Sequence, residues 1–180
     1  MAAQELILQY NFDSSVNTDL DITNIPQTYR HLEVIVAARN NNTNSYWTCY
    51  MYPNQSTATN KWHQSMYSSG STAYTDYNSS AHASNYGISG ANYITGYHNF
   101  FKWFIYDYTN TVTKPTCTWR GGYQHFNGFN WTNVYRQGFG SMDTTSAVTS
   151  LRLTGDGGGS NYWDAGSKIY LIGWNDYAGA

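Results

Sequence analysis

The sequence predicts an all-β protein, a single-domain β-sandwich of jelly-roll-like type with long polar loops. Tyrosine, tryptophan and phenylalanine occur 18, 7 and 7 times in 180 residues, and aromatic side chains favour strands. Apolar residues come in short runs that Gly, Asn, Asp and Ser separate, a spacing typical of sandwiches. No long segment keeps the period of about 3.6 residues that a helix requires.

The first strands are predicted near the N-terminus. Glu5–Phe12 is a short apolar run that ends in a polar stretch, which favours a strand over a helix. Arg30–Ala38 alternates between aliphatic residues and others, so it predicts a strand with one face in the core. The aromatic segment Tyr46–Tyr52 follows a polar turn and is expected to pair with Arg30–Ala38.

A loop-rich insert is predicted for about residues 54–92. Asn54–Asn92 is rich in Ser, Thr, Asn, Gly, Tyr and His and contains Ile88 as its aliphatic residue apart from alanines. Such a composition buries little apolar area to offset the entropy lost on ordering. We expect long surface loops with one or two short strands, and loops of this length are usually functional.

The second half returns to strand patterns. Asn99–Tyr108 is apolar or aromatic on both alternating faces, which predicts a central strand covered on two sides. The later predicted strands are Thr116–Tyr123, Trp131–Phe139, Ala147–Leu153 and Ser167–Trp174. A short tail, 175–180, follows, and the whole chain, 1–180, is predicted to form one domain.

The charge pattern argues against nucleic-acid and membrane partners. The formal net charge is −2, and the lysines and arginines are spread singly, so no basic stripe is present to neutralise phosphates. No window approaches the roughly 20 apolar residues of a spanning helix, and the first residues do not form a secretory leader. We expect synthesis in the cytoplasm.

The two cysteines do not suggest a metal site. Cys49 and Cys117 lack a CxxC spacing, and buried free thiols are favoured over a bridge, although both alternatives remain open at this stage. The histidines are scattered without the paired spacing of zinc ligands. We therefore predict neither a metal nor a cofactor.

No catalytic site is predicted. Glycoside hydrolysis needs two carboxylates held on opposite sides of a sugar, one of them with a raised pKa. The aspartates that could serve as catalytic carboxylates lie in no recognisable catalytic motif; they are Asp76, Asp107, Asp143, Asp156 and Asp164. We expect a protein that is not an enzyme.

Aromatic rings are the candidate contact residues. A ring stacks on the flat face of a sugar, and amide and hydroxyl groups bind the sugar's oxygens; tyrosine also favours protein interfaces. The candidates for a glycan contact or a subunit interface are Tyr67, Tyr74, Tyr77, Tyr86, Tyr93, Trp131 and Trp163. Packing between subunits or under loops is the favoured role, and glycan binding is the alternative.

Four motifs occur in a fixed order: IPQTYRHL at 25–32, FIYDYTNT at 104–111, SAVTSLRL at 146–153 and GSKIYLIG at 166–173. Together they resemble a family of virion structural proteins of tailed bacteriophages. The similarity extends from about residue 5 to 174, and its specificity comes from order and spacing because each motif is short. The resemblance implies a compact all-β domain of a tail fibre, tail tip or capsid surface.

The resemblance leads to a functional expectation. We expect a non-enzymatic structural protein on the virion surface, a capsid decoration or cement protein, which forms a homo-oligomer, with a trimer favoured, and binds the major capsid protein or tail proteins. A fibre needs an attachment segment, and here the first strand begins near residue 5, which favours decoration. The alternative is a receptor-binding or glycan-binding module of a tail fibre or tip, with a host cell-surface glycan as partner.

Overall fold

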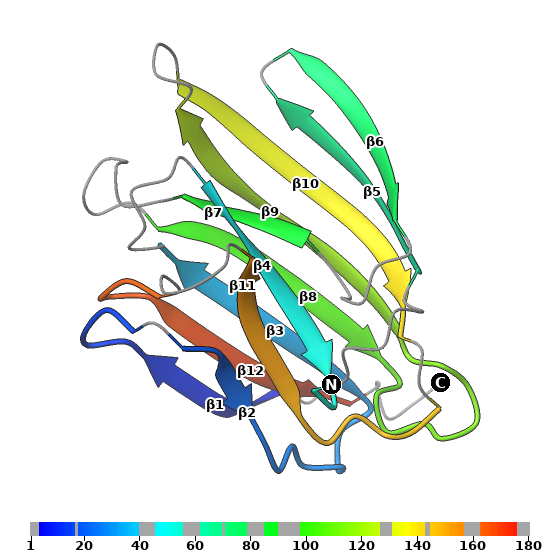
Figure 1. Cartoon of the computed structure of the whole chain (residues 1–180). Coiled ribbons are helices and arrows are strands. Elements are labelled where there is room, and N and C mark those ends of the chain that lie inside the picture. The colour runs from blue at the N-terminus through cyan, green and yellow to red at the C-terminus, as the bar shows by residue number, and fades with distance from the viewer. Residues whose placement is uncertain are drawn as a thin grey trace.

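Two antiparallel sheets of unequal size make up the fold (Figure 1). The computed structural model describes residues 4–16, 18–39, 46–55, 62–69, 71–78, 85–89, 98–126, 131–142, 145–156 and 163–175, and for some strand residues it describes the backbone alone. In that part of the chain there is no helix, and hence none long and apolar enough to cross a membrane.

The larger sheet has eight strands and the smaller has four. The order in the larger sheet is β1 (Gln4–Asn11), β12 (Lys168–Trp174), β3 (His31–Ala38), β8 (Asn99–Tyr106), β9 (Thr116–Phe126), β10 (Trp131–Ser141), β5 (Trp62–Ser69) and β6 (Thr72–Asn78). The order in the smaller sheet is β2 (Leu20–Ile22), β11 (Leu151–Asp156), β4 (Tyr46–Pro53) and β7 (Asn85–Ser89). The predicted all-β sandwich is confirmed, whereas the jelly-roll-like connectivity stays a prediction.

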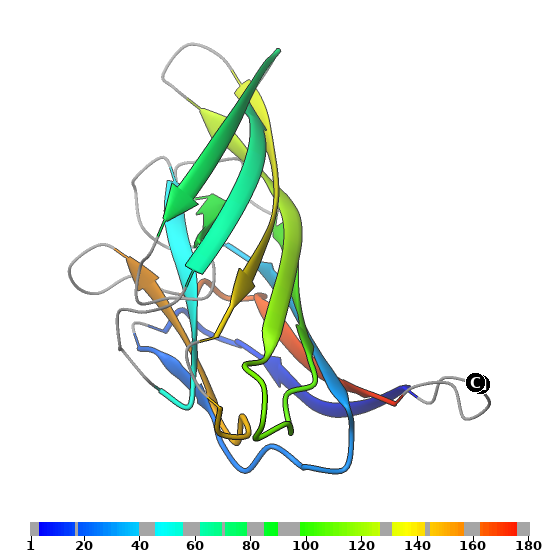
Figure 2. The same cartoon turned by 90° about the vertical axis from the view of Figure 1, so that its right-hand side faces the viewer.

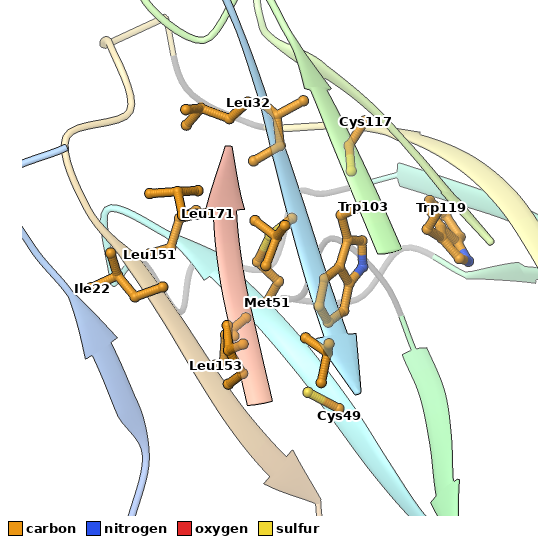
Figure 3. Packing of buried hydrophobic residues seen from close by; sticks show 14 of the residues in the cluster. Ile22, Leu32, Cys49, Met51, Trp103, Cys117, Trp119, Leu151, Leu153 and Leu171 are labelled. Carbon is orange, nitrogen blue, oxygen red and sulfur yellow. The ribbon is translucent and has the colours of Figure 1, made fainter. Parts of the chain in front are cut away.

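The core lies between the inner faces of the two sheets. Alternate side chains of β3 and β8 point inward and are fully buried; they are Leu32, Val34, Val36, Phe101, Trp103 and Ile105. The smaller sheet supplies Ile22, Cys49, Met51, Leu151 and Leu153, and Figure 3 shows these residues packed toward the strands of the larger sheet. Burial of this apolar area drives the two sheets together.

Cys49 and Cys117 are both buried and unpaired in this core. Burial raises the pKa of the Cys49 thiol and that of the Cys117 thiol above their ordinary values, because a thiolate is poorly solvated there. The expectation of buried free thiols is confirmed.

The predicted pairing of Tyr46–Tyr52 with Arg30–Ala38 is wrong. The segment forms β4, which pairs with β11 and β7 in the smaller sheet. Both edges of β3 are already taken by β12 and β8, so β4 faces the larger sheet instead of extending it. Its inward residues Cys49 and Met51 then contribute to the core.

The expectation of mainly irregular loops over 54–92 is also wrong. Three strands lie in it: β5 and β6 extend the larger sheet beyond β10, and β7 forms an edge of the smaller one. Tyrosine and threonine favour extended backbone, and pairing satisfies the backbone donors and acceptors whatever the side-chain polarity. A polar segment can therefore form strands when an existing strand such as β10 offers an open edge.

The prediction that Asn99–Tyr108 is covered on two sides is wrong in one respect. β8 is a central strand, and its inward residues are fully buried. Its outward residues are not: Phe100 is 53% exposed and Tyr106 is 38% exposed. The smaller sheet covers one face alone, so the opposite face presents aromatic side chains to solvent.

The four motif segments meet at one end of the sandwich. The Tyr108 hydroxyl donates to the Pro26 carbonyl oxygen, and the Val148 amide donates to the Tyr108 carbonyl oxygen at 2.8 Å. The Arg30 guanidinium lies 2.6 Å from the Asp107 carboxylate. The Tyr29 ring lies so close to Gly173 that a Cβ there would be 2.3 Å from its Cγ. These residues therefore join the segments and hold the fold together.

A second junction ties three connections around Asp164. Its carboxylate accepts hydrogen bonds from the Ser15 hydroxyl at 2.7 Å and from Arg39 Nε at 2.6 Å. Burial alone would raise the pKa of Asp164, but the hydrogen bonds from Ser15 and Arg39 outweigh burial and lower it. The junction links the residues after β1, the end of β3 and the start of β12.

Acid is expected to destabilise the fold through Asp164. A folded-state pKa below the unfolded value of about 3.9 contributes stability that is present above that value and is lost as pH falls through the folded pKa. At neutral pH, Asp164→Asn should therefore be less stable than the unchanged protein. As the pH falls below about 4, the variant should lose less stability than the unchanged protein does. Urea unfolding at several pH values measures this, and parallel curves for the two proteins would contradict it.

Two neighbouring glycines on β9, Gly121 and Gly122, differ in how closely other atoms approach them. A Cβ on Gly121 would lie 2.5 Å from the Phe101 Cα and 2.5 Å from the Phe100 carbonyl oxygen, whereas the nearest atom at Gly122 is the Val134 carbonyl oxygen, at 3.2 Å. We expect Gly121→Ala to lower stability by about 1–3 kcal/mol or more through overpacking. Gly122→Ala, the matched control, should change it by much less. Equal unfolding midpoints in urea would show that β8 and β9 do not pack this closely.

Candidate functional site

Two of the predicted contact residues lie side by side at the end of the larger sheet. Tyr67 on β5 and Tyr74 on β6 are register partners, and their rings stack with centroids 4.9 Å apart and an interplanar angle of 16°. Tyr74 is 44% exposed. The pair therefore presents aromatic area to solvent next to an edge of the sheet.

An arginine completes this group. Arg136 on β10 is the register partner of Tyr67, and its guanidinium carbon lies 4.7 Å from the centroid of the Tyr67 ring. This is a cation–π contact, which orders the ring and the guanidinium together. We call Tyr67, Tyr74 and Arg136 the tyrosine cluster.

The tyrosine cluster belongs to a part of the larger sheet that projects past the smaller sheet. β7, at the edge of the smaller sheet, lies against β8 and β9, whereas β10, β5 and β6 continue beyond it (Figures 1 and 2). Strand register places the cluster on the inner face of the sheet, the same face as Trp119. Its position leaves an exposed tyrosine where the two-layer packing ends.

Trp163 is placed in the core, which corrects its selection as a contact residue. The side chain is fully buried, and its ring stacks on Phe12 with centroids 5.3 Å apart. The isolated bridge between Val16 and Trp163 holds it there. A glycine-rich neighbourhood in the sequence suggested exposure, but long-range packing decides the burial.

The side chains of the remaining predicted contact residues lie outside the described part of the structure. Tyr77, Tyr86 and Trp131 lie on β6, β7 and β10, and their side chains fall outside the described part of the structure. Tyr93 lies wholly outside it. Their predicted contact roles stay predictions.

The outer face of the larger sheet is a second aromatic surface, which the sequence analysis missed. Large apolar side chains on this face are well exposed; they are Met66, Phe100, Tyr106, Tyr135 and Phe139. The signal for it is the apolar character of both alternating faces in Asn99–Tyr108, which predicts burial on two sides. One of the two faces meets solvent instead.

A groove of about 710 Å³ lies on this face across β8, β9, β10, β5 and β6. Most of its lining side chains belong to the outer face by strand register: Gln64, Met66, Thr75, Lys102, Phe104, Tyr106, Thr118, Arg120, Gln137 and Phe139. A smaller hollow of about 310 Å³ shares Met66, Thr75 and Gln137 with it and extends toward Tyr135. We call the larger hollow the outer groove; its size suits a small ligand or a short chain of sugar residues.

The charges of the outer groove come from Lys102 and Arg120. Lys102 forms an ion pair with the buried Glu33, whose other carboxylate oxygen accepts a hydrogen bond from Trp174 Nε1 at 3.2 Å. Arg120 is exposed, and it has no ion pair with any residue in the described part of the chain. Among the lining residues that the structure describes, none is a carboxylate, and Lys102 and Arg120 are the cations.

The described residues hold no cluster of three or more His, Cys, Asp or Glu side chains that suits a metal ion. Two of the five aspartates considered above have arginine partners: Asp107 pairs with Arg30 and Asp164 with Arg39. The side chains of Asp76, Asp143 and Asp156 lie outside the described part. The arrangement that can be seen is suited to contact and binding.

The comparisons with known proteins give no match: no protein-family model, no curated protein and no solved structure is detectably similar to the chain.

The contribution of the ion pair between Lys102 and Glu33 to the stability of the fold can be measured. Lys102→Met leaves the Glu33 carboxylate buried without its cation, so we expect a loss of about 3 kcal/mol in the free energy of unfolding. Glu33→Gln combined with Lys102→Met removes both charges and should recover part of that loss. A double-mutant cycle in urea measures the coupling, and strictly additive effects would show that the two charges do not interact.

Proposed function

We propose that this chain is a non-enzymatic structural protein on the surface of a tailed-bacteriophage particle, a capsid decoration or cement protein that binds the shell and other copies of itself. The ordered motifs at 25–32, 104–111, 146–153 and 166–173 support the virion assignment. Their residues form the junction around Tyr108, which suits motifs that preserve a fold without carrying out chemistry.

The observation that carries the proposal is the tyrosine cluster with its exposed Tyr74. Stacked tyrosines supply stiff contact area with hydroxyl groups at the rim, and tyrosine and arginine are enriched at the centres of protein interfaces. Tyr74 lies on β6, an edge strand of the sheet, so a neighbouring protein can reach its ring and the strand edge together. The partner is the major capsid protein or a second copy of the chain, in a homo-oligomer for which a trimer is favoured.

A receptor-binding or glycan-binding module of a tail fibre or tip is the second candidate function. The outer groove favours it, because the groove combines aromatic rings with amide and hydroxyl groups. The two candidates use different faces of the larger sheet and are open to separate tests.

Copy number tests the location in the particle. Quantitative gel densitometry of purified virions measures the ratio of this chain to the major capsid protein. We expect the ratio of a protein that is distributed over the whole shell. A ratio close to that of the tail proteins would contradict decoration and favour the second candidate.

A substitution at the tyrosine cluster tests the docking surface. Tyr74→Ser should lower the amount of the chain bound to particles by about tenfold, since a central interface tyrosine commonly contributes more than 1.4 kcal/mol. Tyr10→Ser is the matched control, because Tyr10 is 40% exposed on β1, the opposite edge strand of the same sheet. Equal binding of the two variants, with thermal unfolding showing both folded, would exclude the tyrosine cluster as the docking surface.

A further inference from the structure

We propose that the outer groove binds an acidic saccharide, with Arg120 recognising the carboxylate of the sugar. The inference rests on the second candidate function, glycan binding, and narrows its ligand to a class. It does not depend on whether the chain lies on the capsid or on the tail.

The aromatic walls of the groove follow from strand register. Phe104 on β8, Thr118 on β9 and Phe139 on β10 are consecutive register partners in one row across the sheet. Neighbouring strands lie about 4.8 Å apart, so the Phe104 and Phe139 backbones lie about 10 Å apart with a small threonine between them. Two aromatic side chains with a small threonine between them give the groove apolar walls, which suit the C–H-rich face of a pyranose ring.

Polar groups lie in the next row along the sheet. Lys102, Arg120 and Gln137 are register partners on the same three strands, one outward position away from the row of Phe104. Met66 and Thr75 continue this row on β5 and β6. Amide, hydroxyl and guanidinium groups therefore lie beside the aromatic walls, where the hydroxyl and carboxylate oxygens of a bound sugar need partners.

Charge selects the acidic class. The groove residues that the structure describes include two cations and no carboxylate, although the chain as a whole has a formal charge of −2. Glu33 offsets Lys102, which leaves the guanidinium of Arg120 as the charge without a partner among the described groove residues. A guanidinium binds a carboxylate through two parallel hydrogen bonds, and one such group is too few for the phosphate backbone of a nucleic acid.

A second copy of the chain fits this surface less well. A two-fold contact through the groove would set one concave surface against another and bring the Arg120 of each copy toward a like charge. A ligand that enters the groove avoids both costs. The geometry therefore favours a small acidic chain over self-association on this face.

The test compares two oligosaccharides of the same backbone whose carboxyl groups are either ionised or methyl-esterified. Tetragalacturonate and its fully methyl-esterified form are titrated into the intact protein by calorimetry, up to about millimolar ligand. We expect binding of the acid form at least tenfold tighter than that of the ester. Arg120→Gln should remove this difference, and Phe139→Ala should weaken both forms.

The control for charge is Lys168→Gln. Lys168 is an exposed cation on β12, on the same outer face but outside the groove lining, so its loss should leave both affinities unchanged. Equal affinities for acid and ester would overturn the acidic assignment while leaving glycan binding intact. If the protein binds neither form, the inference itself is wrong. It is also wrong if the unchanged protein sediments as an oligomer and Phe139→Ala as a smaller species, because the groove would then be a self-association surface. If Arg120→Gln is present in purified particles at the normal copy number, docking on the particle does not depend on Arg120.

Discussion

The structure depends on the burial of one face of an eight-stranded sheet by a sheet of half as many strands. Trp103, Phe101 and Leu32 lose all contact with water because β4 and β11 cover them. This burial is the main favourable term in the stability of the fold. The same geometry leaves two surfaces uncovered, namely the outer face and the projecting strands, and these are the surfaces that the two proposed functions would use.

The inner face shows how the chain adjusts to close packing. Gly121 and Gly138 lie on this face where the backbone of β8 and the Trp119 ring approach too closely for any Cβ. At the end of the sandwich, Tyr108 joins the segment before β3, the end of β8 and the segment before β11 through hydrogen bonds of its hydroxyl and backbone. The four ordered motifs therefore have a structural role here, since they connect the strands that carry the core.

The two exposed surfaces differ in chemistry. The tyrosine cluster is aromatic and lies next to an edge strand, which suits docking against a protein. The outer groove is concave, lined by rings, amides and Arg120, which suits a small polar ligand. A particle-surface protein with both would attach by one face and present the other to the surroundings. Capsid attachment and glycan recognition are compatible on this arrangement.

Several features were predictable from local pattern alone. The alternation in Arg30–Ala38 predicted β3 and its buried face, because side chains on a strand alternate between two sides. The shortage of charge and of helical period predicted an all-β sandwich, and isolated cysteines predicted buried thiols. Tyr67 and Tyr74 were selected as contact residues from composition, and the register of β5 with β6 brings them together.

Other features depended on which strands found which partners. Residues 54–92 form strands because β10 offered an edge, and Tyr46–Pro53 joined the smaller sheet because both edges of β3 were occupied. The burial of Trp163 and the exposure of Phe100 were decided by what lies opposite each residue in space. The sequence by itself determined the all-β class, the alternation of strands such as β3 and the low charge of the chain. The tertiary structure alone decided which apolar face is covered, because coverage depends on contacts between segments far apart in the chain.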